Sequence, residues 1–182
     1  GCGAGFFLGV AWKSGWEAEG VEPSQWAADY ARGALGRFVH AGDVASANLK
    51  PESYDVITAW DVVEHMTDPA GDFRKLAGAL KPDGLMAFST HSIESLSARL
   101  LGPLYPFLMT MHVSHFTPFT TALLCRKAGL RQFRVEPHVR WLRLGYIAKK
   151  IESGAPRTAS LIRKALEALG LSDSCVPVAG LG

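Results

Sequence analysis

Residues 1–8 read GCGAGFFL, and residues 20–24, which follow after one predicted helix, read GVEPS. Glycines at alternate positions before an apolar run predict a loop that leads into a buried helix, with a backbone that a ligand can approach closely. Glu22 lies 21 positions after Gly1, at the end of the next predicted strand. A carboxylate at that offset can accept hydrogen bonds from both ribose hydroxyls of an adenosine cofactor. Together, the loop and the acid predict a nucleotide-binding α/β fold.

The spacing of the glycines distinguishes between classes of nucleotide site. A dinucleotide fingerprint requires a third small residue, so that the helix can pack on the strand. Phe6 or Leu8 occupies that place here, depending on where the count begins. A phosphate-binding loop of the Walker type requires Gly-Lys-Ser or Gly-Lys-Thr, which does not follow. The pattern G-x-G-x-G therefore disfavours both a nicotinamide dinucleotide and a nucleoside triphosphate.

Strands and helices alternate along the rest of the chain. Residues 54–60 (YDVITAW) predict a strand buried on both faces. Asp68 and Pro69 predict a capped helix start. The inward face of that helix is predicted to consist of Phe73, Leu76, Ala77 and Leu80. Residues 118–129 predict a later helix with Phe119, Ala122 and Leu123 inward, and residues 130–136 predict a strand. This alternation predicts a mostly parallel α/β sheet with helices on both faces.

Composition limits the remaining function classes. The chain has 182 residues, of which 48% are hydrophobic and 20% charged, as expected of one globular domain. Its formal net charge of +2 demands neither nucleic acid nor an anionic membrane. Cys2, Cys125 and Cys175 are far apart, which favours a reducing, cytoplasmic setting. The longest apolar stretch, around residues 100–113, contains one glycine and two prolines, so we expect no membrane span.

Six stretches of sequence together resemble a class I S-adenosylmethionine-dependent methyltransferase, of the branch that contains the ubiquinone-biosynthesis O-methyltransferases. They follow the family's order over most of residues 1–130, and they are GCGAGFFL (1–8), GVEPS (20–24), GDV (42–44), YDVITAWDVVEH (54–65), LKPDGLMAFST (80–90) and HVSHFTPFTTALLCRKAGL (112–130). The resemblance implies a Rossmann-like methyltransferase fold and S-adenosyl-L-methionine as the cofactor. It also implies transfer of a methyl group to an O, N or C atom of a small molecule.

The resemblance also assigns the residues that would bind the cofactor. The glycine loop would surround its methionine and ribose parts, and Glu22 would bind the ribose hydroxyls. Asp43 and Val44 would face the adenine, with Asp43 accepting from the exocyclic amine. Trp60 and Asp61 would border the cofactor and the substrate entrance, although Trp60 also fits a core position. The complete set of predicted cofactor residues is Gly1, Cys2, Gly3, Gly5, Glu22, Pro23, Asp43, Val44, Trp60 and Asp61.

Methyl transfer requires alignment of the acceptor, exclusion of water and, for some acceptors, removal of a proton. Four histidines are candidate bases because imidazole titrates near neutral pH, and they are His65, His91, His112 and His115. We predict His115 and His65 as the catalytic residues, and a loop-stabilising hydrogen bond is the other interpretation of His65. No carboxylate or thiol stands at ligand spacing beside His112 and His115, so we expect no metal.

We expect one domain over residues 1–182. Within it, residues 91–117 are predicted to be a substrate-covering insertion and residues 151–182 a C-terminal helical extension. An apolar lid at residues 103–109 predicts a hydrophobic or aromatic acceptor, although such a loop also fits a simple cover of the core. In the family, a first strand precedes the glycine loop and a last antiparallel strand follows a segment like residues 176–178. We therefore expect both strands to be missing, the sheet to be gapped and the cofactor affinity to be low.

Two other functions stay open on the sequence alone. One is an NAD(P)-dependent oxidoreductase, and the other is a domain that binds a cofactor or a partner without catalysis, because no decisive catalytic residue stands out. A nucleic-acid methyltransferase is disfavoured. Amino-directed enzymes of that kind carry an Asp/Asn-Pro-Pro-aromatic segment where this chain reads DVVE at residues 61–64, and no basic stripe interleaved with aromatics is present. We expect no nucleic-acid partner, and the oligomeric state has no signal in the sequence.

Overall fold

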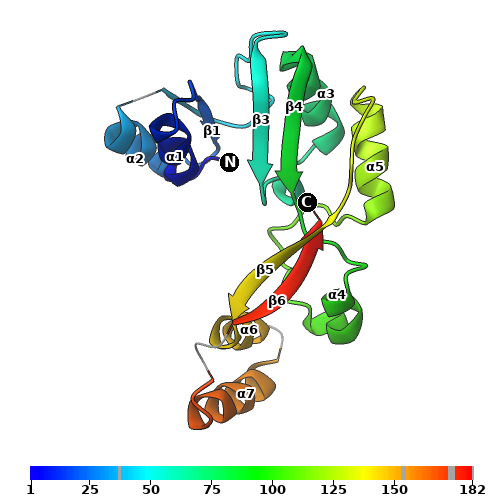
Figure 1. The fold of residues 1–182 in the computed structure, drawn as a ribbon. Helices are drawn as coiled ribbons and strands as arrows, with labels where there is room; N and C mark the ends of the chain where they lie inside the picture. Colours follow the sequence, from blue (N-terminus) through cyan, green and yellow to red (C-terminus); the bar gives the residue numbers. More distant parts are fainter. Residues whose placement is uncertain (37, 153–154, 172–174, 182) are drawn as a thin grey trace. The chain divides into compact units, whose positions relative to one another are not determined.

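The computed structural model describes residues 1–36, 38–152, 155–171 and 175–181 (Figure 1). The chain divides into two compact units, and each unit is made of several chain segments. The first unit comprises Gly1–Val62, Asp68–Phe88 and Leu124–Arg131. The second unit comprises Val63–Thr67, Ser89–Leu123 and Gln132–Gly182.

The first unit begins with two helices and a pair of short strands. These elements are α1 (Phe6–Lys13), β1 (Gly20–Glu22), α2 (Gln25–Leu35) and β2 (Val39–Ala41). β1 and β2 are parallel, with Glu22 opposite Ala41. A small core packs the helices against these strands, and its buried side chains are Leu8, Ala28, Ala31 and Val39.

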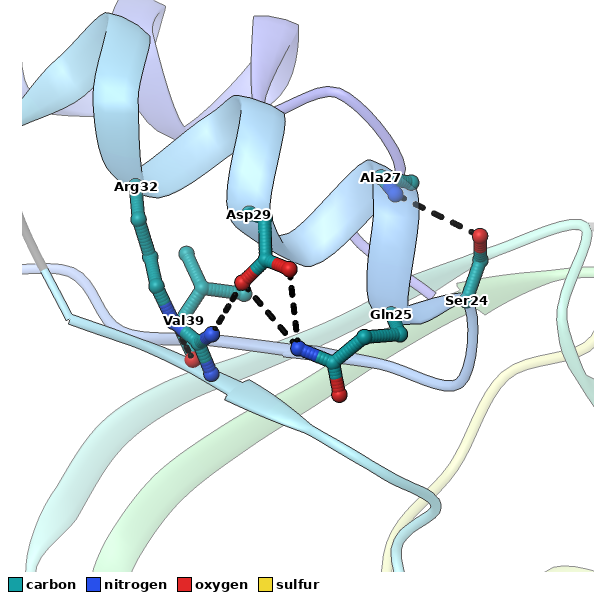
Figure 2. Close-up of polar contacts among 6 residues, drawn as sticks. All are labelled: Ser24, Gln25, Ala27, Asp29, Arg32 and Val39. Atoms are coloured by element: carbon teal, nitrogen blue, oxygen red, sulfur yellow. Dashed lines mark hydrogen bonds and ion pairs between the residues drawn. The ribbon is translucent and has the colours of Figure 1, made fainter.

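Polar contacts fix α2 at both ends (Figure 2). The Ser24 hydroxyl accepts a hydrogen bond of 3.3 Å from a backbone N–H of the first turn, as an N-cap serine does. Farther along the helix, Asp29 accepts a hydrogen bond from Gln25, the first residue of α2, and forms a 2.6 Å ion pair with Arg32. Arg32 Nε also donates to the backbone oxygen of Val39 at 2.8 Å. The last turn of α2 is therefore attached to the first residue of β2.

The rest of the first unit is built from β3 (Tyr54–Trp60), α3 (Pro69–Ala79) and β4 (Leu80–Ser89). β3 and β4 pair with each other and run in the same direction (Figure 1). α3 begins as predicted, because Asp68 Oδ1 accepts from Gly71 N at 2.9 Å. Its predicted inward face is confirmed for Phe73, which is fully buried. The Phe73 ring meets Phe88 of β4 edge-on at 5.0 Å between centroids.

Two elements of the first unit are less buried than the sequence predicts. In β3, Ala59 is buried, but Val56 is 36% and Trp60 44% exposed. In α1, Leu8 is buried, whereas Phe6 is 81% exposed. β3 pairs only with β4, and no strand within the described ranges joins the β3–β4 pair to β1–β2. The two pairs are thus separate, which agrees with the expected gap in the sheet and leaves one edge of β3 unpaired in this part of the chain.

The second unit contains helices and one pair of strands. Its elements are η1 (Val63–His65), α4 (Leu96–Leu101), η2 (Gly102–Leu104), α5 (Pro118–Lys127), β5 (Pro137–Arg143), α6 (Leu144–Ile151), α7 (Pro156–Ala168) and β6 (Cys175–Leu181). β5 and β6 form an antiparallel pair, and α6 lies against α7 (Figure 1). The last residues of α5 and all of β4 except Ser89 belong to the first unit. Of the helices that the structure describes, none is both long and apolar enough for a membrane crossing.

Three predictions about the C-terminal half need correction. The strand predicted over residues 130–136 begins only at Pro137. The buried face of the α5 region is made of Thr121, Leu124, Cys125 and Ala128 instead of the predicted face, of which Phe119 is 74% exposed. Residues 176–178 lie inside β6, antiparallel to β5. An antiparallel strand is therefore present where we expected the chain to stop short of one, and residues 151–182 hold this strand as well as α7.

We expect Phe73→Ala to lower the free energy of unfolding by about 3–5 kcal/mol, because it removes a fully buried ring and leaves a cavity. Phe119→Ala is the matched control, since the Phe119 side chain is 74% exposed, and it should cost less than about 1 kcal/mol. Urea unfolding followed by circular dichroism measures both. Equal losses in the two variants would contradict the assignment of Phe73 to the core.

Candidate functional site

The glycine loop, residues 1–5, lies across the end of β1. Cys2 N donates to the backbone oxygen of Val21, and Gly5 N donates to that of Cys2, both at 3.0 Å. Gly3 and Gly5 have φ angles of 54° and 82°, a left-handed conformation that glycine adopts without steric cost. A Cβ atom added to Gly3 would meet no atom within 4 Å. A ligand can therefore approach the backbone of the loop at this point.

Glu22, the last residue of β1, connects the glycine loop to the start of α2. Its Oε2 accepts a 2.8 Å hydrogen bond from Gly3 N, and its Oε1 accepts a 2.9 Å hydrogen bond from Ser24 N. The residue is only 9% exposed. Each carboxylate oxygen offers about two acceptor positions, so Glu22 retains room for two further donors. This geometry fits the predicted role of Glu22 as the acceptor for ribose hydroxyls.

Asp43 and Val44 follow β2 at the same edge of the parallel pair. Gly42 N donates to the backbone oxygen of Glu22 at 2.9 Å, which joins the two strand ends. Asp43 is exposed, and its Oδ1 accepts from Ser46 N at 2.8 Å. The hydrogen bonds from Ser46 hold the pKa of Asp43 below its usual value. Both predicted acids thus lie where open α/β sheets bind ligands, at the carboxyl ends of the strands.

Trp60 and Asp61 lie at the end of β3, beside the glycine loop. The Trp60 ring meets Phe7 edge-on at 5.9 Å between centroids and is partly exposed, so it is not a core residue. A Cβ atom added to Gly1 would lie 2.5 Å from Val62 Cγ2, which shows how closely the two segments approach. Asp61 has a φ of 54°, in the left-handed region. The first unit therefore brings together the loop, Glu22, Asp43 and the end of β3.

Cys2 and Pro23 contribute to this arrangement in different ways. A Cβ atom added to Gly20 would lie 2.6 Å from Cys2 Sγ, so the thiol packs against β1. Burial raises the pKa of this thiol. Pro23 is exposed and lies between Glu22 and the capping residue Ser24. Cys2 is part of the loop, and its thiol also donates to the backbone oxygen of Gly3 at 3.9 Å. The cofactor contacts predicted for Cys2 and Pro23 stay predictions.

The second unit contains a cluster of titratable side chains, which we call the histidine cluster and which consists of Glu64, His65, His91, His112 and His115. His91 lies at its centre and is 5% exposed. Its Nε2 is 2.9 Å from His115 Nδ1. Its ring stacks on His112, with 4.6 Å between centroids and 21° between planes. The two histidines of the HVSH segment therefore both contact His91.

Glu64 is the buried acid of the histidine cluster, at 3% exposure. Its Oε2 accepts a 2.8 Å hydrogen bond from Thr90 Oγ1. Its Oε1 is 3.6 Å from His91 Nδ1, which is too long for a hydrogen bond. Burial by itself raises the pKa of Glu64, but the neighbouring His91 and Thr90 outweigh burial and leave the pKa below its usual value. Glu64 is consequently a carboxylate at neutral pH.

The predicted catalytic pair, His65 and His115, takes different positions in the histidine cluster. His65 Nδ1 bonds the backbone oxygen of Met111 at 2.9 Å, so the expected loop-stabilising hydrogen bond is present. His65 and His112 also contact each other, with 4.8 Å between ring centroids. The His115 side chain is exposed overall. Partial desolvation, together with the neighbouring His91, lowers its pKa. The structure thus joins both histidines to one network.

Residues 103–109, the predicted apolar lid, cover the histidine cluster. Tyr105 is 3% exposed, and its ring lies 6.4 Å from that of His91. The Phe107 ring stacks on His91 at 6.0 Å between centroids. Leu108, by contrast, is 46% exposed. The segment therefore excludes water from His91 on one side and presents apolar surface on the other.

Glu64 was not among the functional residues predicted from the sequence. Glu64 precedes His91 by 27 positions and His112 by 48, so no local spacing links them. One signal was present, since a Glu-His pair directly after a predicted strand is typical of a site and not of a core.

A family model described as a methyltransferase domain matches residues 1–134. Among curated proteins, the ubiquinone biosynthesis O-methyltransferase of Neisseria meningitidis serogroup C is 33% identical over 91 residues, which cover 46% of this chain and 38% of that protein. The protein of the same name from Yersinia enterocolitica is 31% identical over 123 residues, or 63% of this chain and 51% of that protein. The chain therefore spans about half the length, or less, of these two curated relatives.

Solved structures show the same fold. A SAM-dependent methyltransferase from Thermotoga maritima is 27% identical with a TM-score of 0.61, over 78% of this chain and 65% of that one. The YcgJ protein of Bacillus subtilis has a TM-score of 0.65 at 20% identity, over 88% of this chain and 71% of that one. The predicted Rossmann-like fold is confirmed.

We expect Thr90→Val to lower the free energy of unfolding by about 1.5–3 kcal/mol, because it removes a hydrogen bond to a buried carboxylate and keeps the side-chain shape. Thr110→Val is the matched control, since Thr110 is exposed, and it should change stability by less than about 0.5 kcal/mol. Urea unfolding measures both variants. If Thr90→Val costs no more than the control, the bond to Glu64 does not stabilise the cluster.

Proposed function

The chain belongs to the methyltransferase-domain family, and we propose that it transfers a methyl group from S-adenosyl-L-methionine to an O, N or C atom of a small hydrophobic or aromatic molecule. The observation that carries the proposal is the Glu22 carboxylate, which is buried and held by Gly3 N and Ser24 N. It stands at the end of a strand beside a glycine loop, where an adenosine ribose would require it.

The first unit supplies the groups that would hold the cofactor. The open backbone of the loop at Gly3 would receive its ribose and methionine parts. Glu22 would accept from the ribose hydroxyls through its free acceptor positions. Asp43, kept ionised by Ser46, would accept from the adenine amine, and Val44 would line the same edge.

The bound cofactor supplies a methyl group on a positively charged sulfur, so the protein needs to align the acceptor and exclude water. The partly exposed face of Trp60 can attract that positive charge, and Asp61 stands next to it. His115 is the candidate base for acceptors that lose a proton, and its Nδ1 is held by His91 at 2.9 Å. His65 is the second candidate base. Its Nδ1 is bound to the backbone oxygen of Met111, so Nε2 would be the atom that accepts the proton.

The acceptor is proposed from the apolar segment at residues 103–109 and from the names of the relatives. Tyr105 and Phe107 pack over His91, which favours an aromatic or hydrophobic molecule over a polar one. The curated relatives are named as O-methyltransferases of ubiquinone biosynthesis, which supports an oxygen atom as the acceptor.

Cys2 and Cys125 are free thiols, which supports the expected cytoplasmic setting.

The test measures binding of S-adenosylhomocysteine to the chain by calorimetry. Glu22→Ala should weaken this binding at least about tenfold, because hydrogen bonds to a charged group are lost. Glu17→Gln is the matched control, since Glu17 is an exposed acid outside the site, and it should bind as tightly as the parent. Because Glu22 also anchors the loop, Asp43→Ala serves as a second variant and should weaken binding several-fold.

Binding that is unchanged in both Glu22→Ala and Asp43→Ala would refute the proposed cofactor site. Tight binding of NADH in place of S-adenosylhomocysteine would instead indicate the oxidoreductase. Binding without methyl transfer to any acceptor in a screen with labelled donor would indicate a cofactor-binding domain that lacks catalysis.

A further inference from the structure

Three side chains of the second unit bring metal-ligand atoms together. A carboxylate oxygen of Glu64 and one ring nitrogen each of His65 and His112 all lie within 4.8 Å of one another. Glu64 and His65 come from η1, and His112 comes from the segment that precedes α5. Glu64 and His112 are buried, whereas His65 is exposed, so an ion can enter from the side of His65.

Hydrogen bonds determine which ring nitrogen each histidine presents. His65 Nδ1 is bonded to the backbone oxygen of Met111 at 2.9 Å, and His112 Nδ1 to that of Phe107 at 2.6 Å. A carbonyl oxygen can only accept, so both Nδ1 atoms carry the proton. In the neutral ring, Nε2 then carries no proton, and its lone pair is available to bind a metal ion. Histidine ligands of metal ions are held in this way, with the other ring N–H donating to a carbonyl or carboxylate.

A hydrogen bond also orients the carboxylate of this set, because Thr90 Oγ1 donates to Glu64 Oε2 at 2.8 Å. Metal-binding carboxylates are oriented by hydrogen bonds in the same manner.

The buried charge of Glu64 lacks a strong counter-charge in the described part of the chain. The nearest basic group there is His91, whose Nδ1 stands 3.6 Å from Oε1. That Nδ1 is itself buried and has no hydrogen-bond partner. Burial of a carboxylate is costly unless it is paired or bound to a metal ion. Of these two groups, His91 Nδ1 is the one without a hydrogen-bond partner, and the cost of burying the Glu64 carboxylate is what favours a cation beside Oε1.

We propose that Glu64, His65 and His112 bind one divalent transition-metal ion of the zinc class. Two imidazoles and one carboxylate form a donor set that favours zinc over magnesium, which prefers oxygen ligands. Bond lengths of about 2.0–2.2 Å require the three ligand atoms to draw closer than their present separation. Small rotations of the exposed His65 side chain can supply this change. A fourth position stays open for water or for an oxygen or nitrogen atom of a ligand.

This proposal revises the expectation of no metal and does not depend on methyl transfer. The HVSH segment shows no neighbouring carboxylate in the sequence, but the fold brings Glu64 to it. His65, which we considered as a base, is then a ligand through Nε2, while His115 lies outside the set of three.

The test uses the chain after dialysis against a chelator. Titration with zinc sulfate in a calorimeter should show one site per chain, and cobalt(II) should give the visible absorption bands of a low-symmetry site. His65→Ala should weaken zinc binding at least about 100-fold, because one of three ligands is lost. His40→Ala is the matched control, since His40 lies in the first unit and bonds Ser46, and it should leave the affinity unchanged.

Because a buried variant such as His112→Ala can affect folding, the exposed His65→Ala carries the test. Its unfolding without metal is compared with that of the parent chain, because His65 also bonds the backbone oxygen of Met111. Zinc should also raise the melting temperature of the parent chain and not that of His65→Ala. Absence of zinc binding to the parent chain would overturn the proposal, and so would equal zinc affinity in His65→Ala and the parent. Binding of magnesium as tightly as zinc would also overturn it. None of these readouts involves S-adenosylhomocysteine, so failure here is separate from failure of the proposed function.

Discussion

The architecture of the first unit depends on one buried carboxylate. Glu22 accepts one backbone N–H from the glycine loop at Gly3 and another from Ser24 at the start of α2. Its own backbone oxygen accepts from Gly42 at the end of β2. A three-residue strand such as β1 has few ladder bonds with which to hold three segments. The charged hydrogen bonds of Glu22 supply that connection, and they also hold the carboxylate at the edge where a ribose would bind.

Local patterns predicted the elements better than they predicted burial. The start of α3 followed from Asp68 and Pro69, and the bounds of β3 followed from its run of β-forming residues, because both signals act within a few positions. The inward face of α5 was wrong, since Phe119 is exposed and Thr121 is buried. Hydrophobicity alone does not say which face of a helix meets a neighbour. That depends on segments distant in sequence.

The two candidate sites differ in how far the sequence reveals them. The cofactor site follows a linear order of loop, acid and strand ends, so spacing predicted Glu22, and the family resemblance assigned Asp43 after the next predicted strand. The histidine cluster follows no such order. Glu64 and His112 meet because η1 and the segment before α5 lie beside each other within the second unit, where Ser114 N donates to the backbone oxygen of Glu64 at 3.2 Å. A search for ligands among sequence neighbours of His112 had no means of finding this acid.

The backbone conformation of Asp61 affects which substitutions at this position would stabilise the protein. Its φ of 54° lies in the region where glycine is at home and a side chain costs roughly 1 kcal/mol or more, less for the short polar side chain of aspartate. Replacement by glycine would therefore relieve the backbone strain. It would also delete an acidic group at the end of β3, beside the proposed cofactor site. Stability and the proposed function thus favour different residues at this position, so selection for more stable variants would act against the side chain that the proposed site uses.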